Sequence, residues 1–234
     1  MSSATQRADE LAVTFTERFV TADGVRIRYL EAGRGTPVVV LHGSAGLMPS
    51  PLNNLLAQQF RVIAFEIPGF GRSAVKERSQ SMRDLAHTLA EAVTAIGLER
   101  YGLVSTTSSA PLALWQAIAV QERIDALVLI SPLALLPEGW TAASSFNRDP
   151  ELERRLGDIK VATLMLLGTK DEVIPPETGR LYVERIPNCY YALVYDAGHV
   201  IEAERPEALF AAVRDFLEQR ETFVVSRRNT VINP

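Results

Sequence analysis

The chain has 234 residues, of which 47% are hydrophobic and 22% are charged, and these are ordinary values for a globular protein with one large domain. Its net charge of −4 and pI near 5.5 provide no electrostatic attraction for phosphate backbones, so we expect no nucleic-acid partner. No segment approaches the roughly 18 uninterrupted apolar residues of a membrane span, and the N-terminus lacks the apolar stretch of a secretory signal. The single cysteine, Cys189, cannot form an internal disulfide. We therefore expect a cytoplasmic protein without membrane partners.

The first predicted elements form a hairpin. Residues 18–22 and 25–31 read as strands, and Asp23-Gly24 between them is a two-residue turn signal. The domain is thus expected to open with an antiparallel pair at one edge of a sheet.

Short apolar runs alternate with helical patterns from residue 37 onward, which is typical of a mostly parallel sheet covered by helices. The runs at 38–41, 62–65, 127–130 and 164–167 are apolar at consecutive positions. This pattern predicts central strands that are buried on both faces.

Apolar residues three or four positions apart predict helices over 82–96 and 206–217. Residues 132–158 interrupt the alternation with a mixture of large apolar side chains, proline and charge, and we interpret them as a short lid insertion. The tail, residues 221–234, contains a strand-like TFVV. The sequence leaves open whether this tail extends the sheet, pairs with another copy as a homo-oligomer, or hangs free.

Four segments place polar or small residues where predicted strands end. LHGSAG follows one strand, and its turn leaves backbone N–H groups able to face an anion, although glycine commonly ends a strand for structural reasons alone. VSTTSSAP forms a strand-to-helix corner, and Asp171 and His199 each follow a further strand. A lone aspartate is usually a cap and a lone histidine usually a packing residue. In combination these segments indicate a ligand site, because ligands of open α/β sheets collect at strand ends.

The motifs LHGSAG, EIPGFGRS, LVSTTSSAPLAL, LLGTKDEVIPP and DAGHVIEAERPE occur in the order and with the spacing of the α/β-hydrolase family. The chain resembles that family over about residues 17–220. The resemblance implies the α/β-hydrolase fold, a mostly parallel central sheet flanked by helices, as a single domain over residues 1–234 with the short lid. It also implies a catalytic triad that runs nucleophile, acid, histidine along the chain, with Asp171 and His199 at the last two positions.

The nucleophile position departs from the family pattern of Gly-x-Ser-x-Gly. Counting from the strand and from the helix puts Thr107 at the nucleophile, with Ser105 and Ser109 where glycines belong. Ser108 is out of register by one residue and is the alternative nucleophile. A nucleophile in this turn adopts a positive φ, which is strained for a β-branched residue and makes the turn either relaxed or specialised.

The resemblance implies an enzyme, a carboxylic-ester-type hydrolase acting on a small ester, lactone or thioester. Thr107 would attack, His199 would accept its proton, and Asp171 would orient the imidazole. The backbone N–H groups of Ser44 and Ser108 would form the oxyanion hole. We expect no cofactor and no metal, because the three histidines are not part of a clustered ligand set.

Trp140 and Phe146 of the predicted lid are candidate substrate contacts, and each could equally cover the apolar rim of the sheet. Two other functions remain open. The His199–Asp171 pair could act as a general base without an acyl-enzyme, as in the lyases and cofactor-free oxygenases of the family. Alternatively, the pocket could belong to a small-molecule binding protein that has lost turnover.

Overall fold

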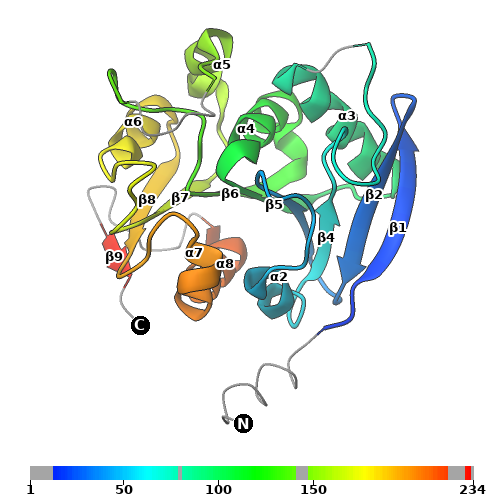
Figure 1. The fold of residues 1–234 in the computed structure, drawn as a ribbon, viewed down its shortest axis with the longest axis horizontal. Helices are drawn as coiled ribbons and strands as arrows, with labels where there is room; N and C mark the ends of the chain where they lie inside the picture. The colour runs from blue at the N-terminus through cyan, green and yellow to red at the C-terminus, as the bar shows by residue number, and fades with distance from the viewer. Residues whose placement is uncertain (1–12, 79–80, 141–146, 221–229, 233–234) are drawn as a thin grey trace.

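A computed structural model describes residues 13–78, 81–140, 147–220 and 230–232. These residues form a nine-stranded sheet in the order β1-β2-β4-β3-β5-β6-β7-β8-β9 (Figure 1). The pairs β1–β2 and β2–β4 are antiparallel and the remaining pairs are parallel. The strands are β1 Thr16–Ala22, β2 Val25–Ala32, β3 Pro37–Leu41, β4 Arg61–Phe65, β5 Tyr101–Thr106, β6 Ile124–Ile130, β7 Thr163–Gly168, β8 Cys189–Val194 and β9 Thr230–Ile232.

Helices cover both faces of the sheet. The α-helices are α2 Pro51–Leu56, α3 Met82–Ala95, α4 Ala110–Ala119, α5 Pro150–Arg155, α6 Thr178–Arg185, α7 Ile201–Glu204 and α8 Pro206–Gln219. In Figure 1, α3, α4 and α6 lie on one side of the sheet, and α2, α7 and α8 lie on the other. The two apolar clusters of the core follow this division, one beneath each helical layer.

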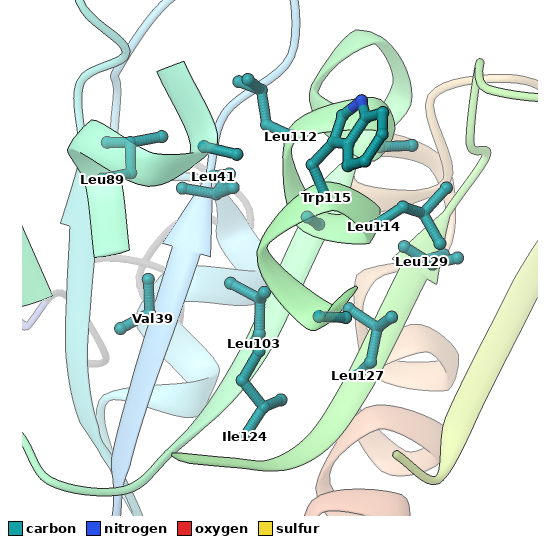
Figure 2. Packing of buried hydrophobic residues seen from close by; sticks show 14 of the residues in the cluster. Val39, Leu41, Leu89, Leu103, Leu112, Leu114, Trp115, Ile124, Leu127 and Leu129 are labelled. Atoms are coloured by element: carbon teal, nitrogen blue, oxygen red, sulfur yellow. The ribbon is translucent and has the colours of Figure 1, made fainter. Parts of the chain in front are cut away.

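The core on the α3–α4 side is built by apolar residues at helical spacing. Leu85, Leu89 and Val93 all lie on the buried side of α3, as their spacing predicts. Figure 2 shows side chains of α4, β5 and β6 packed together in the same cluster, among them Trp115 and Leu103. These contacts fix α4 above β5, and therefore fix the corner between them.

The hairpin, the buried central strands and the helices that the sequence predicts are present. Ala22 pairs with Val25 across the predicted two-residue turn, and β1 is an edge strand. The predicted helix over 82–96 is α3, and the predicted helix over 206–217 is α8. Ser81 precedes α3 as its N-cap residue, and its side chain accepts a hydrogen bond from Asp84 N–H and so caps the first turn.

The segment 132–158, predicted to be a lid, is anchored at several points. Tyr182 Oη accepts hydrogen bonds from the N–H groups of Ala134 and Leu135, at 3.2 and 3.1 Å. Further along, Asp149 caps α5 and also accepts a 2.9 Å hydrogen bond from Trp115 Nε1. The described part of this segment is thus held against α4 and α6.

The C-terminal tail extends the sheet through a segment that the sequence did not single out. Thr230–Ile232 forms β9 and pairs in parallel with β8, whereas the TFVV stretch lies outside the described residues. Within the described ranges, no helix has the length and apolarity needed to cross a bilayer.

Burial predicts which substitutions destabilise the sheet. Leu103 of β5 is 0% exposed, whereas Val75 is 54% exposed. Leu103→Ala should lower the free energy of unfolding by about 2–5 kcal/mol, because it removes buried apolar contacts and leaves a cavity. Val75→Ala, the matched control, should change it by about 0.5 kcal/mol or less. Urea denaturation measures both, and equal effects would contradict the described packing.

Candidate functional site

The sheet brings the predicted site residues to one edge. Strands β3 and β5 are parallel neighbours, so the residues that follow them, Ser44 and Thr107, lie at the same end of the sheet. Strands β7 and β8 are also parallel neighbours, and Asp171 and His199 follow them. The carboxyl ends of adjacent parallel strands thus assemble the site, as expected for an open α/β sheet.

Asp171 and His199 form a hydrogen-bonded pair. The imidazole Nδ1 lies 3.0 Å from Asp171 Oδ2 and 3.2 Å from Oδ1. The carboxylate is fully buried and also accepts hydrogen bonds from the N–H groups of Val173 and Ile174, at 2.9 and 2.8 Å. Because a carboxylate only accepts, the proton of the neutral imidazole is assigned to Nδ1, which leaves Nε2 free to accept another.

Close backbone packing sets the distance between the loops that carry this pair. A Cβ added at Gly168, the last residue of β7, would lie 2.2 Å from Ala197 O and 2.3 Å from Gly198 O. No side chain fits at such a separation. The absence of one at residue 168 therefore lets the His199 loop approach the Asp171 loop.

Thr107 has a φ of 46°, in the left-handed region that β-branched residues rarely adopt. Its carbonyl accepts a 2.9 Å hydrogen bond from Leu133 N–H. A Cβ added at Gly43 would lie 2.4 Å from Thr107 Oγ1, so the hydroxyl occupies space that only a glycine leaves open. The hydrogen bond from Leu133 stabilises Thr107 at the positive φ expected for this turn, and Gly43 leaves room for its hydroxyl.

Serines replace the two glycines of the family pattern without disrupting the corner. Ser109 Oγ lies 2.9 Å from Thr106 O and 3.1 Å from Leu41 O, and it accepts a 3.2 Å hydrogen bond from Thr106 N–H. This side chain therefore links the ends of β5 and β3. Ser105 is fully buried, and its hydroxyl has no hydrogen-bond partner among the described residues.

The two predicted oxyanion donors, Ser44 and Ser108, each lie in a tight turn that follows a strand. Ser44 is the second residue of a turn that is closed by a 3.2 Å hydrogen bond from Gly46 N–H to Gly43 O. Ser108 lies in the first turn of a short 3-10 helix, Thr107–Ser109, where N–H groups have no partner within the helix. Their use as oxyanion donors stays a prediction.

A cavity of about 390 Å³ opens beside these loops, a volume that suits a small molecule. Ser44, Thr107 and His199 all line it. Most of its remaining wall comes from residues 45–51 and 53, at the start of α2, and from residues 200–203, which include most of α7. Figure 1 shows these two helices on the same side of the sheet.

Ser108 and Trp140, two of the predicted site residues, do not line this cavity. Ser108, the alternative nucleophile, is partly buried but is not part of the wall. Trp140 is also outside the wall, and its Nε1 donates a 2.8 Å hydrogen bond to Val173 O. Phe146 lies outside the described residues. Substrate contact by Trp140 and Phe146 stays a prediction.

Two positioning residues were not identified from the sequence. His42 Nε2 accepts a 3.0 Å hydrogen bond from Ile67 N–H, so Nδ1 carries the proton and donates to Gly43 O at 2.7 Å. Burial lowers the pKa of His42, which favours this neutral form. Glu204 Oε2 accepts a 2.6 Å hydrogen bond from Gly198 N–H, next to His199. Both residues lie inside motifs that carried the resemblance. Their hydrogen bonds to backbone groups cannot be detected from the spacing of residues in the sequence.

Glu66 is held as part of the scaffold. Its carboxylate accepts hydrogen bonds from Arg28 and from the N–H groups of Arg72 and Ser73, at 2.9, 2.8 and 2.7 Å. Burial raises the pKa of Glu66, but these hydrogen bonds outweigh it and the pKa is lowered overall. Glu66 is therefore an ionised anchor for the loop after β4.

Comparisons with known proteins agree with this architecture. A family model described as the alpha/beta hydrolase fold matches residues 36–151. A curated relative, 2-hydroxy-6-oxo-6-(2'-aminophenyl)hexa-2,4-dienoic acid hydrolase of Metapseudomonas resinovorans, is 24% identical over 94% of this chain and 97% of its own length.

Solved structures share the fold. A serine hydrolase involved in carbazole degradation, the CarC enzyme, superposes with a TM-score of 0.76 at 24% identity, covering 88% of this chain and 100% of its own. Carboxylesterase CesB from Bacillus subtilis superposes with a TM-score of 0.75 at 18% identity, covering 91% of this chain and 95% of its own. Taken with the family match and the arrangement of the strand ends, these similarities establish that the chain belongs to the α/β-hydrolase superfamily.

Proposed function

We propose that this chain hydrolyses a small ester, lactone or thioester through a Thr107–His199–Asp171 triad. The observation that carries the proposal is the common cavity. Thr107, in its left-handed turn, and His199, hydrogen-bonded to Asp171, both line it. Curated relatives that include dienoic acid hydrolases and a putative carbamate hydrolase of Caulobacter support hydrolysis as the reaction.

The proposed reaction begins when Thr107 Oγ1 attacks the substrate carbonyl and His199 Nε2 accepts the hydroxyl proton. Buried Asp171 stabilises the imidazolium that forms. The N–H groups of Ser44 and Ser108 donate to the oxyanion. His199 then protonates the leaving alcohol or thiol, and a water molecule activated by His199 releases the acyl group from Thr107.

The size of the cavity supports a small-molecule substrate, because about 390 Å³ lies at the lower end of typical ligand pockets. The wall contributed by residues 45–51 and 53 is mostly apolar. We infer that the acyl part of the substrate is short. The cytoplasmic location expected from the sequence, and the homo-oligomer that the sequence leaves open, remain untested.

Substitutions at Thr107 test the nucleophile. Thr107→Ser removes a methyl group from a residue at φ 46°, where strain costs about 1–3 kcal/mol. If part of that strain opposes the transition state, kcat/KM on short activated esters should rise by about ten- to a hundredfold, at 1.36 kcal/mol per decade. Thr107→Ala should abolish covalent labelling by an organophosphate.

Ser108→Ala is the control for a register error, and it should keep the labelling. Loss of activity and labelling in Ser108→Ala but not in Thr107→Ala would move the nucleophile to Ser108. Turnover that survives Thr107→Ala would indicate a general-base enzyme instead. A parent that is inert on esters, lactones and thioesters but is stabilised by small ligands would indicate a binding protein.

His199→Ala should lower kcat/KM by about a hundred- to ten-thousandfold, because it removes the general base. His87→Ala removes an exposed histidine from α3 and should leave kcat/KM unchanged. Steady-state assays on the same ester compare the two variants. Similar activity in His199→Ala and the parent would rule out the triad.

Chelation tests the expectation that catalysis needs no metal. The sequence contains three histidines, and the described residues hold no group of three His, Cys, Asp or Glu arranged to bind a metal ion. Dialysis against EDTA should therefore leave ester hydrolysis at its starting rate. Activity that is lost on dialysis and restored by added zinc would contradict the proposal.

A further inference from the structure

Glu202 is a carboxyl group in the wall of the cavity that the triad does not use. It belongs to α7 and lines the cavity together with His199 and Ser50. Burial raises the pKa of Glu202, while a hydrogen bond with the Ser50 side chain acts in the opposite direction. Glu202 is therefore only partly exposed to solvent, and it is accessible to a molecule in the cavity.

The two buried carboxylates Asp171 and Glu66, by contrast, each have several partners. Asp171 is held by His199 and two backbone N–H groups, and Glu66 is held by Arg28 and two backbone N–H groups. Within the described part of the chain, Glu202 has one partner, the neutral side chain of Ser50. Ser50 also accepts a hydrogen bond from Asn53 N–H as the cap of α2, so its oxygen is shared. Glu202 is thus the carboxyl group at this site with the least compensation for its charge.

The described residues that line the cavity include no lysine and no arginine. Apart from Glu202, its ionisable side chains are His42 and His199. His42 is fixed in the neutral form by its two backbone hydrogen bonds, and His199 is paired with Asp171. A substrate anion would therefore meet a carboxyl group and no cation.

The rest of the wall favours an apolar chain. Met48 and Val200 line the cavity and are 69% and 56% exposed, so they form an apolar entrance. A partly desolvated carboxylate without a cationic partner is unfavourable, and pairing it with a ligand cation relieves that cost. The same carboxylate repels a ligand anion.

We propose that Glu202 is a specificity residue that binds a protonated amino group of the substrate and excludes substrates with a carboxylate at that position. The inference rests on the proposed hydrolase function, and it narrows the substrate class to esters whose acyl chain ends in an ammonium group. The enzyme would then recognise its substrate by the ammonium group at the end of the acyl chain as well as by the reacting carbonyl.

The test uses nitrophenyl esters of matched chain length that end in an ammonium, methyl or carboxylate group. The parent should have the highest kcat/KM for the ammonium ester and the lowest for the carboxylate ester. Glu202→Gln keeps the size of the side chain and a partner for Ser50 but removes the charge, so it should reduce the ammonium-to-methyl ratio of kcat/KM by about tenfold, or 1.36 kcal/mol. Glu207→Gln, which removes an exposed carboxylate at the start of α8, should leave this ratio unchanged.

A ratio that Glu202→Gln does not change, or a parent that prefers the carboxylate ester, would overturn the proposal. Calorimetric titration with hexylamine and hexanoate separates selectivity from turnover. Glu202-dependent preference for hexylamine in a protein that cleaves no ester would uphold the selectivity and reject the hydrolase function. Ester hydrolysis without any Glu202-dependent preference would uphold the hydrolase function and reject the selectivity.

Discussion

The site depends on a threonine whose backbone adopts a conformation that β-branched residues avoid. Thr107 has a φ of 46°, at a cost of about 1–3 kcal/mol that the surrounding contacts must offset. The packing of α4 on the sheet fixes the corner, Leu133 N–H binds the Thr107 carbonyl, and Ser109 links the corner to the end of β3. Gly43 leaves room for the hydroxyl itself. The strained turn is therefore a product of the fold, and it directs the hydroxyl toward the loop after β3.

Most of the fold could be predicted from the sequence because its signals are periodic. Consecutive apolar residues indicated strands such as β3 and β7, and apolar residues three or four apart indicated α3 and α8. The order of the motifs also placed Asp171 and His199 at strand ends, where the structure brings them within 3.0 Å of each other. Parallel strands meet at one edge of a sheet, so chain order alone carried this information.

The wall of the cavity could not be predicted in the same way. The sequence suggested lid residues such as Trp140 as substrate contacts, and it did not indicate that most of the described wall comes from the segments that enter α2 and α7. Glu202 lies inside a motif that was recognised for its histidine, and nothing in its spacing distinguishes a carboxyl group that faces a cavity from one that faces water. Ser109 is a similar case. In the sequence it is only a departure from the glycine of the family pattern, whereas in the structure its hydroxyl lies within hydrogen-bond distance of Leu41 O and Thr106 O. Such features depend on distances between segments far apart in the chain.

A mutation at Gly168 can disrupt the His199–Asp171 pair without changing either residue of the pair. The carbonyl oxygens of Ala197 and Gly198 occupy the space of a side chain at residue 168, so even alanine there would push the two loops apart. One codon change could thus separate the imidazole from its carboxylate while both remain in the sequence. In a comparison of genomes, a member of this superfamily with an intact triad motif but a substituted glycine at this position would be counted as an enzyme although its pair is misaligned. A search for lost activity in the superfamily should therefore read residue 168 together with the triad.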